Sequence, residues 1–455
     1  MYMPDRMFSG NDAYRERTLF MRYRNNLPRL LIADDFGKIR EHPRLLMVGG
    51  EGTHLVRPRK KILIRLPTYS KLFYLPGCRP IGYDPETGKY VVLRRFGRRP
   101  VHAVSAFLPP GYLRLMIPAA DWSRRGDIFP LWAYSAVGWS AGEFVAPALI
   151  LDRTTRWDPE NYDDEELIPA TKRLKRLFPA NRLLDHLVNC AHEYHCFAAK
   201  NLFLERWEAP LPVSRSCNMQ CLGCLSFQPP TGCVASHERI AFTPSADEVT
   251  ELAVHHLERA EEPIVSFGQG CEGEPLMQAE LIEQCIRRIR MATGKGIINL
   301  NTNGYDPEKV LSLARAGLDS IRVSMASARP DIFNRYHKPA DCTIEEVLES
   351  IRIAGREGVY TMINYLVFPG VTDREEEITT LTKVVARTNV RFIHLKNLNI
   401  DPDYYLQSLD AGSWEKGFGM AKLPQRIKES IPDVELGYFN RWRLPAGGKA
   451  GVDDE

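Results

Sequence analysis

The chain has no long hydrophobic run. Its most apolar stretch, Pro130–Trp139, is too short and too interrupted to span a bilayer. The first ten residues, Met1–Gly10, lack the basic start and apolar core of a secretory signal peptide. We therefore expect a cytoplasmic protein with no membrane span.

Strong overall charge is also absent, since the formal net charge of the 455 residues is +3 at pH 7. Positive charge is concentrated in residues 1–100, which hold 21 lysine and arginine residues against 9 aspartate and glutamate residues. The basic runs Arg57–Lys61 and Arg94–Arg99 could face an anionic partner. Because no RNA-binding motif accompanies them, we expect solvated strand edges instead, and nucleic acid is an unlikely partner.

Cysteine is sparse except in one place, where Cys217, Cys221 and Cys224 stand within eight residues. Thiolates are soft ligands that select iron–sulfur clusters or zinc. A disulfide framework is the weaker interpretation, because an odd triplet cannot pair fully. A structural zinc site stays open as an alternative, with Cys233 or His237 as the fourth ligand.

From about residue 208 the sequence alternates short apolar runs with amphipathic helical patterns. We expect six strands, at residues 208–214, 263–267, 296–301, 319–325, 360–367 and 391–397. Ser245, Thr343 and Thr372 each stand three residues before a glutamate, as in a capping box. Asp306 followed by Pro307 is a further helix start. Strict alternation predicts an α/β fold with a parallel sheet, although periodicity does not separate an open sheet from a barrel.

The rest of the chain is expected to differ in structure. Residues 1–155 are rich in apolar runs, turns and prolines, and Asp84–Lys89 is a predicted hairpin turn, so we interpret them as a β-rich domain of unknown role. Residues 156–207 have a helical pattern and are expected to be a linker that packs on the parallel sheet. Residues 401–455 form a C-terminal extension, whose end at Ala446–Glu455 is expected to be disordered.

The spacing of Cys217, Cys221 and Cys224 (C-x-x-x-C-x-x-C) resembles the signature of the radical S-adenosylmethionine (radical SAM) superfamily. The resemblance implies a six-unit partial (β/α) barrel over residues 208–400. It implies that the three cysteines hold a 4Fe–4S cluster and leave one iron open for S-adenosylmethionine. One electron, from a donor such as flavodoxin or ferredoxin, then cleaves the cofactor to a deoxyadenosyl radical that abstracts a hydrogen atom from the substrate.

The resemblance extends to the loops that follow the predicted strands. Gly273-Glu274-Pro275 resembles the superfamily's Gly-Gly-Glu-Pro motif, which holds the amino group of the bound methionine. By position, the other candidates for cofactor contact are Asn303, Ser324, Asn364, Asn397 and Leu398. A serine or asparagine at a strand end is also a common turn former, so their joint placement after successive strands carries this prediction.

Two positions depart from the family pattern. Gly223 stands before the third cysteine, where an aromatic residue commonly packs on adenine, so Phe227 or Met219 is expected to cover the base instead. The loop Gly268–Pro275 is longer and more polar than the usual turn, and it contains Cys271. As a thiol beside a radical, Cys271 could donate a hydrogen atom, ligate a second cluster or simply fill space.

Absences narrow the subfamily. No cysteine follows Cys342, so the cysteine-rich C-terminal extension of many peptide-modifying members is missing. No cobalamin-binding signature is present, which argues against a cobalamin-dependent methylase. An auxiliary metal could be held by residues drawn from Cys190, His192, His195, Cys196, Cys233 and Cys271. Of these, Cys190 is expected to be a small buried residue on a helix.

The leading hypothesis is a radical SAM enzyme. Its substrate stays open between a peptide or protein side chain, a small metabolite and a lipid, because substrate contacts come from loops and from a domain without a recognisable pattern. The alternative is a non-catalytic zinc- or iron–sulfur-binding module whose basic N-terminal domain contacts nucleic acid or protein.

Overall fold

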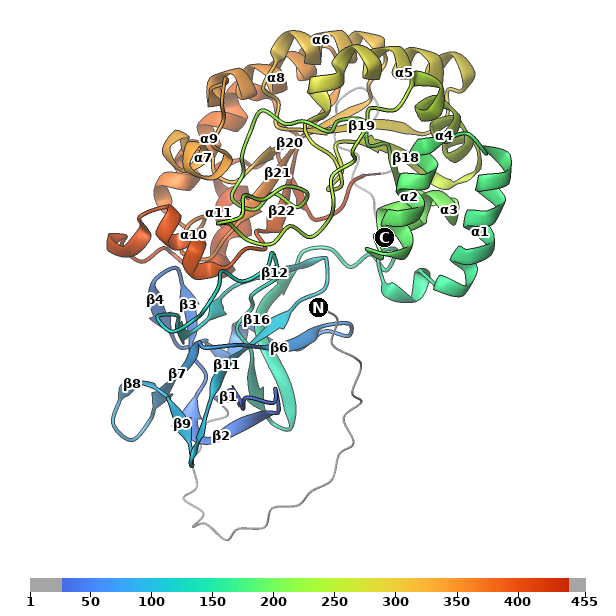
Figure 1. Ribbon diagram of the computed structural model, residues 1–455. Helices are drawn as coiled ribbons and strands as arrows, with labels where there is room; N and C mark the ends of the chain where they lie inside the picture. The colour runs from blue at the N-terminus through green and yellow to red at the C-terminus, as the bar shows by residue number, and fades with distance from the viewer. Residues whose placement is uncertain (1–26, 442–455) are drawn as a thin grey trace.

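The computed structural model describes residues 27–441 and contains a β-rich region, three helices and an α/β region in chain order (Figure 1). The expectations for Met1–Gly10 and Ala446–Glu455 concern residues outside this range. None of the helices between residues 27 and 441 is long and apolar enough to cross a membrane.

Antiparallel strands build the β-rich region, and its main sheet contains the order β12-β16-β15-β1-β2-β7-β14. The strands are β1 (Arg29–Ala33), β2 (Ile39–Leu46), β3 (Gly49–Glu51), β4 (His54–Val56), β5 (Leu63–Arg65), β6 (Lys71–Leu75), β7 (Arg79–Asp84), β8 (Lys89–Val92), β9 (Arg95–Phe96), β10 (Arg99–Pro100), β11 (His102–Phe107), β12 (Tyr112–Arg114), β13 (Ile117–Pro118), β14 (Ala120–Asp121), β15 (Gly138–Ser140) and β16 (Glu143–Ile150). Asp84 pairs with Lys89 between β7 and β8, which confirms the predicted hairpin.

Three helices follow, α1 (Asp164–Leu177), α2 (Arg182–His192) and α3 (Phe197–Phe203). One face of α2 is buried, since Leu183, Leu184 and Leu187 are at most 1% exposed. Arg182, at the start of α2, forms an ion pair of 2.8 Å with Glu248 on the first helix of the α/β region. This contact joins α2 to the α/β region.

A curled sheet of seven parallel strands forms the α/β region, in the order β17-β18-β19-β20-β21-β22-β23. The strands are β17 (Arg206–Pro210), β18 (Glu261–Phe267), β19 (Ile297–Thr302), β20 (Ser320–Met325), β21 (Tyr360–Val367), β22 (Phe392–Asn397) and β23 (Glu435–Gly437). The six expected strands are all present, but the first covers residues 206–210, and residues 211–214, expected to belong to it, lie in the loop that follows. The seventh, β23, was not expected: it pairs with β22 from beyond residue 400.

Helices connect these strands and cover the outer face of the sheet (Figure 1). They are α4 (Ala246–Arg259), α5 (Ala279–Ala292), α6 (Pro307–Ala316), α7 (Pro330–His337), α8 (Ile344–Arg356), α9 (Glu375–Thr388), α10 (Pro402–Ser408) and α11 (Leu423–Ser430). Between residues 27 and 441 the structure also contains five short 3-10 helices, at Lys60–Ile62, Pro159–Asn161, Pro275–Gln278, Ala411–Ser413 and Met420–Lys422.

Local sequence signals set most of the helix starts. Ser245 and Thr343 form the predicted capping boxes, and Asp306 caps α6 with Pro307 at the first position. The capping box predicted at Thr372 is wrong, because α9 begins two residues later than that motif requires and has no side-chain cap. The Thr372 hydroxyl instead accepts a hydrogen bond of 2.9 Å from the backbone N–H of Phe368, and so closes the turn after β21.

Successive residues of each parallel strand point to opposite faces of the sheet. On β20, Ile321 and Val323 are fully buried in the core that also contains residues of the outer helices. The alternate residues Arg322 and Ser324 therefore point inward. We call the inner side of the curled sheet, toward which these side chains of β17–β22 point, the lumen.

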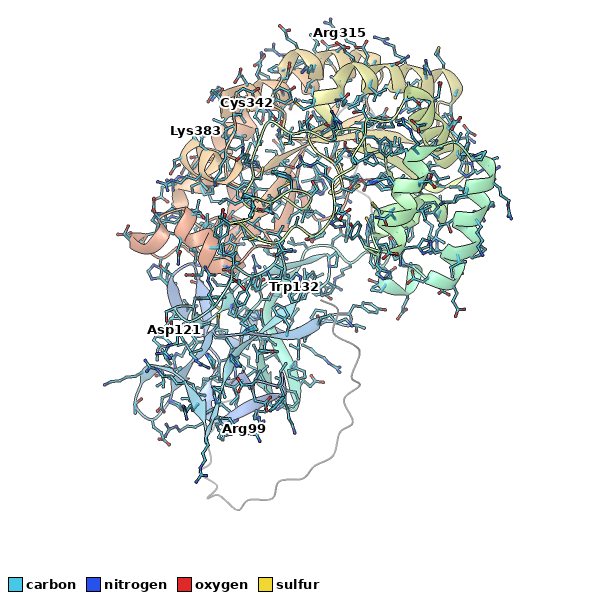
Figure 2. The ribbon with its side chains drawn as sticks, viewed as in Figure 1. Arg99, Asp121, Trp132, Arg315, Cys342 and Lys383 are labelled. Atoms are coloured by element: carbon cyan, nitrogen blue, oxygen red, sulfur yellow. The ribbon has the colours of Figure 1, made fainter. Side chains whose placement is uncertain are left out.

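The β-rich region lies against the end of the α/β region where β22 finishes. The Asn397 side chain bonds both the N–H of Arg114 (2.8 Å) and the carbonyl of Tyr112 (2.7 Å), on β12. The Arg114 guanidinium in turn donates to the carbonyl of Leu398 at 2.8 Å, and burial lowers its pKa to about 9. Trp132 also lies at this junction (Figure 2). The contact places the β-rich region beside the carboxyl end of β22, where sites of parallel barrels form.

Candidate functional site

The three cysteines lie on a long loop between β17 and α4, residues 211–244, which we call the cysteine loop. The loop lies along the C-terminal part of α7. The N–H of Leu222 donates to the carbonyl of Tyr336 at 3.0 Å, and the N–H of Gln220 donates to that of His337 at 3.1 Å. These backbone contacts give the loop a defined path although it has no regular secondary structure.

All three loop cysteines are free thiols with partly exposed side chains. Burial raises the pKa of Cys217 to about 11, and the pKa of Cys221 lies well above its ordinary value because of burial and the charges of Cys217 and Cys224. The environment of Cys217 and Cys221 thus disfavours thiolate. A cationic metal centre reverses this preference, because ligating thiols lose their protons.

The three sulfur atoms suit a cluster better than one ion. Among residues 27–441, a single trio of metal-ligating side chains has all its ligand atoms within 4.8 Å of one another, and it does not include Cys217, Cys221 or Cys224. Two thiolates on one tetrahedral zinc ion would be about 3.8 Å apart. Three more widely spaced thiolates fit the corners of an iron–sulfur cluster.

Two donors point at these sulfurs. The His337 ring nitrogen Nδ1 lies 3.3 Å from Cys221 Sγ, and an Arg239 guanidinium nitrogen lies 3.6 Å from Cys224 Sγ. Burial lowers the pKa of His337 to about 3, so its ring is neutral. Sequence analysis missed both residues. His337 is far from the three cysteines in the chain, and Arg239, although it is on the cysteine loop, belongs to no recognisable motif.

The loop that follows β18, Gly268–Pro275, is joined to the cysteine loop by backbone hydrogen bonds. The N–H of Gly273 donates to Ser214 at 2.6 Å, and that of Glu274 donates to Ser216 at 2.8 Å. A Cβ at Gly273 would lie 2.0 Å from the carbonyl oxygen of Ser216. Glycine is therefore required at this position, because the two backbones approach too closely for any side chain.

Glu274 is buried, and its carboxylate accepts hydrogen bonds from three protein groups. These are the N–H of Leu276 (3.0 Å), the N–H of Asn303 (2.8 Å) and the hydroxyl of Thr302. Burial raises the pKa of Glu274 to about 7. The carboxylate thus ties the β18 loop to the end of β19, and its contact with the methionine amino group stays a prediction.

Glu272, two residues before Glu274, has a similar role and was missed from sequence. Its carboxylate accepts from the N–H groups of Val213 (2.8 Å) and Ser214 (3.0 Å), where the cysteine loop begins. It also accepts from the N–H of Gln269 at 3.2 Å in its own loop. Burial raises the pKa of Glu272 to about 7. A buried carboxylate that bonds several N–H groups holds both loops in place.

The structure brings some of the other predicted residues to the cysteine loop. Asn303 donates from its side chain to Asn218 at 2.8 Å. A Cβ at Gly223 would lie 2.8 Å from the hydroxyl of Tyr336 and 3.6 Å from Leu398. Those two side chains occupy the space beside Gly223, which explains why a larger residue is absent there.

Phe227 and Met219, the side chains expected to cover adenine, are both on the cysteine loop but differ in exposure. Phe227 is 57% exposed and its ring stacks under Arg239, with 5.2 Å from the guanidinium carbon to the ring centre. Met219 is buried in the core and pairs with Pro339. Their contact with adenine stays a prediction.

Ser324 and Asn364 are register partners on β20 and β21 and face the lumen. Asn364 Oδ1 is buried without a hydrogen-bond partner among the described residues, so it is free to accept from a ligand. Asn397 differs, because both ends of its amide already bond β12. The structure therefore shows a docking contact at Asn397, and its predicted contact with the cofactor stays untested.

Deeper in the lumen is a polar network that sequence analysis missed. Glu208 accepts from the hydroxyl of Ser266 at 2.6 Å and from the amide of Asn440 at 2.9 Å. The Asn440 oxygen accepts from Arg322 at 3.0 Å. Asn440, just beyond β23, thereby bridges β17 and β20.

Lys396 on β22 adds a second cation to the lumen. Its Nζ lies 3.6 Å from the ring centre of Tyr438 and 5.1 Å from that of Phe439. Burial and the charge of Arg322 hold the pKa of Lys396 well below its ordinary value, and burial lowers that of Arg322. Each of the two charges makes burial of the other in its charged form less favourable, because like charges repel strongly where the dielectric constant is low.

Comparison with known proteins agrees with the site. Residues 211–381 match the family model of the radical SAM superfamily. The GTP 3',8-cyclase of Aquifex aeolicus is 27% identical over 251 residues, which cover 51% of this chain and 73% of that protein. That of Microcystis aeruginosa is 31% identical over 124 residues, which cover 27% and 37% of the two chains. The chain thus spans less than half the length of some of its relatives.

Two solved structures are also similar. One is described as native anSMEcpe with bound AdoMet (20% identity, TM-score 0.34, covering 42% of this chain and 51% of that one). The other is a radical SAM methyltransferase from Sphaerobacter thermophilus (15% identity, TM-score 0.36, covering 52% and 67%). The family match and the relatives favour the enzymatic hypothesis over a non-catalytic metal-binding module. Residues 211–381 thus carry a radical SAM domain, the type of domain that uses a 4Fe–4S cluster and S-adenosylmethionine, and the chain is an enzyme.

Proposed function

We propose that this enzyme takes a hydrogen atom from a small anionic substrate, one that carries a carboxylate or phosphate group, bound in the lumen. The observation that carries the proposal is the pair of cations, Arg322 and Lys396, on inward-facing positions of β20 and β22. Small metabolites are thereby favoured among the three substrate classes left open by the sequence.

The lumen holds two cationic side chains, and both Glu208 and Asp152 interact electrostatically with Lys396. Glu208 is the carboxylate that Asn440 links to Arg322, and it offsets one of the two cations. Arg322 Nε is buried without a partner among the described residues, and Lys396 Nζ contacts ring faces. A carboxylate or phosphate would supply the acceptor that Arg322 Nε lacks, and arginine binds such groups through paired hydrogen bonds.

The position of Arg322 along β20 agrees with a substrate that is bound deeper in the lumen than the cofactor. Arg322 precedes Ser324 by two residues, about 7 Å along the strand. Ser324 and Asn364 are predicted to contact the cofactor, so an anion on Arg322 lies deeper in the lumen than the cofactor. When bound, S-adenosylmethionine supplies the deoxyadenosyl radical that takes the hydrogen atom. The residues of the lumen hold the substrate and exclude water around it.

The named relatives give independent support for an anionic substrate. Several are GTP 3',8-cyclases, whose name specifies GTP, a molecule with three phosphate groups. Identity of 24–31% over part of each chain does not show that this chain binds the same nucleotide. The class of ligand, a small molecule with negative charge, is what the relatives and the lumen share.

Radical SAM enzymes require a one-electron donor, and we propose flavodoxin or ferredoxin for this one. Either would deliver its electron to the cluster near the partly exposed Cys217, Cys221 and Cys224. We also propose a cytoplasmic location, because all ten cysteines are free thiols, which suits a reducing compartment.

The experiment is a substrate screen with isotope transfer. The anaerobically reconstituted enzyme is reduced with dithionite in the presence of S-adenosylmethionine and deuterated candidates. Sets of carboxylates and phosphate esters are compared with uncharged analogues of equal size. We expect deuterium in 5'-deoxyadenosine from an anionic candidate. Equal transfer from its uncharged analogue, or transfer from a peptide or lipid alone, would overturn the proposal.

Matched variants test the two cations. Arg322→Gln and Lys396→Gln should raise the KM of the anionic substrate, whereas Arg315→Gln, on the exposed surface of α6 (Figure 2), should leave it unchanged. Cleavage of S-adenosylmethionine without substrate should be similar in all three variants. An unchanged KM in both lumen variants would remove the cations from the substrate site.

A further inference from the structure

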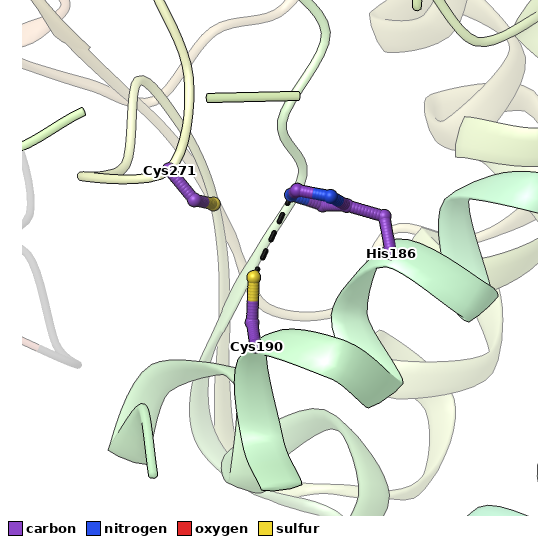
Figure 3. Close-up of side chains that lie close together, drawn as sticks. All are labelled: His186, Cys190 and Cys271. Atoms are coloured by element: carbon purple, nitrogen blue, oxygen red, sulfur yellow. Dashed lines mark hydrogen bonds between the residues drawn. The ribbon is translucent and has the colours of Figure 1, made fainter. Parts of the chain in front are cut away.

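His186, Cys190 and Cys271 form a second group of metal-ligating side chains, separate from the cysteine loop (Figure 3). His186 and Cys190 stand four residues apart on α2, so they share one face of the helix. Cys271 comes from the β18 loop. One ligand atom from each residue lies within 4.8 Å of the other two.

The spacing of these atoms is close to that of ligands on a single metal ion. His186 Nε2 and Cys190 Sγ are 3.5 Å apart. A nitrogen at about 2.0 Å and a sulfur at about 2.3 Å from a tetrahedral zinc ion are themselves about 3.5 Å apart. A 4Fe–4S cluster, in contrast, needs sulfur ligands that are more widely spaced.

We propose that His186, Cys190 and Cys271 bind one zinc ion. Imidazole and thiolate ligands together are typical of zinc, and zinc needs no redox partner. Cys190 and Cys271 are buried, so a bound ion would be shielded from exchange with solvent. The site is independent of the substrate proposed above, since it contains none of the lumen residues.

The fourth ligand in this proposal is His237. Its Nδ1 is buried and has no hydrogen-bond partner among the described residues. It interacts electrostatically with Cys190, and its ring packs on Tyr194 with 5.1 Å between ring centres. An imidazole nitrogen without a partner, near Cys190, would complete a Cys2His2 set.

The zinc ion would join two regions of the molecule that hold the catalytic loops. Cys271 precedes Glu272, whose carboxylate bonds the start of the cysteine loop. The carbonyl of Cys271 also accepts from the N–H of Ile240 at 2.8 Å, near the end of that loop. An ion bound to Cys271, α2 and His237 would therefore fix the β18 loop and the cysteine loop relative to the helices before β17.

The test is metal analysis of the protein purified anaerobically without chelator, with zinc and iron measured by mass spectrometry. We expect about one zinc ion per chain in addition to the cluster iron. Cys190→Ala and His186→Ala should lose the zinc and keep the iron, and Cys78→Ala, a buried cysteine of the β-rich region, should keep both. His237→Ala should retain zinc that a competing chelator removes more readily.

Cobalt gives a second readout that does not depend on activity. Cobalt in place of zinc should show the visible absorption of a tetrahedral thiolate-ligated ion, and Cys271→Ser should change that spectrum. Zinc-free protein after incubation with zinc and reductant would overturn the proposal. So would zinc retained in both Cys190→Ala and His186→Ala, or a Cys190–Cys271 disulfide in the native protein. Loss of iron together with zinc would show a shared iron site instead.

Discussion

His337 donates a hydrogen bond to the sulfur of Cys221. Its Nε2 accepts from the backbone N–H of Ala326 at 3.1 Å, so the proton of the neutral ring is on Nδ1, which lies 3.3 Å from Cys221 Sγ. The histidine is on α7, and Ala326 follows β20, so the ring is held from two sides. A donor to a ligating sulfur stabilises its negative charge and tunes the potential of the cluster.

Replacing His337 should therefore change the cluster without removing it. We expect His337→Phe to make the midpoint potential of the cluster more negative, because the sulfur of Cys221 loses a donor that favours the reduced state. A potentiometric titration followed by electron paramagnetic resonance measures the shift. His337→Asn, whose amide N–H can replace Nδ1–H, should restore part of it. Equal potentials in wild type and His337→Phe would assign the ring to packing.

Alanine at any one of Cys217, Cys221 or Cys224 should abolish cluster binding and S-adenosylmethionine cleavage together. Three thiolates are the minimum that holds the cluster and leaves one iron open. Iron content, absorbance and the yield of 5'-deoxyadenosine check this. Cys285→Ala, a buried cysteine on α5, is the control that should keep iron. A loop variant with full iron and full cleavage would show that its cysteine is not a ligand.

Glu274→Ala should weaken both the fold and the binding of the cofactor. Its carboxylate satisfies two buried N–H groups, and leaving these unpaired costs roughly 1–3 kcal/mol. If it also holds the methionine ammonium, affinity for S-adenosylmethionine falls about tenfold or more. Denaturant unfolding and calorimetry separate the two effects. Thr302→Val removes one neighbour of the carboxylate and keeps its charge, so its cofactor affinity should stay near normal.

Asn397 and Asn364 should give opposite results when each is changed to alanine. Asn397→Ala loses two hydrogen bonds to β12, so the free energy of unfolding should fall by roughly 1–3 kcal/mol with little change in cofactor affinity. Asn364→Ala removes an oxygen that has no partner among the described residues, so stability should hold and cofactor affinity should fall. The reverse pattern would place Asn397 in the cofactor site.

Stability should fall on mild acidification because of His256. Its Nε2–H donates to the carbonyl of Trp207 at 2.7 Å, and burial lowers the pKa of His256 from 6.5 to about 4, with His255 and Glu205 as its charged neighbours. The unfolded chain thus binds the proton first. The contribution is complete above pH 6.5 and is lost as the pH falls toward 4, by roughly 3 kcal/mol.

His256→Gln tests this dependence. The glutamine amide can still donate to Trp207 but does not titrate. Urea unfolding measured between about pH 4 and 7 should show a flatter profile for the variant than for the wild type. Identical slopes would show that other groups cause the loss of stability in acid.

Much of the α/β region follows from sequence because its signals are local. Ser245 and Thr343 bond N–H groups three residues away, and the strands from β18 to β22 are short segments rich in apolar residues. The spacing of Cys217, Cys221 and Cys224 is local as well. The same reasoning was wrong at Thr372, where a turn took the hydroxyl that the helix was expected to use. The domain boundaries at residues 155, 207 and 400 stay predictions, and β23 joins the sheet from beyond the last of them.

Sequence by itself determined the order of strands and helices, the cysteine motif and the β-rich character of the first region, since each depends on residues that are close in the chain. Tertiary structure alone decided which distant side chains meet. It placed Cys271 beside Cys190, 81 positions earlier, and Asn397 beside Arg114, and it put Arg322 and Lys396 in one lumen. Such contacts depend on how the packed helices and the curled sheet bring separate segments together. No local pattern in the sequence determines which of these distant segments meet.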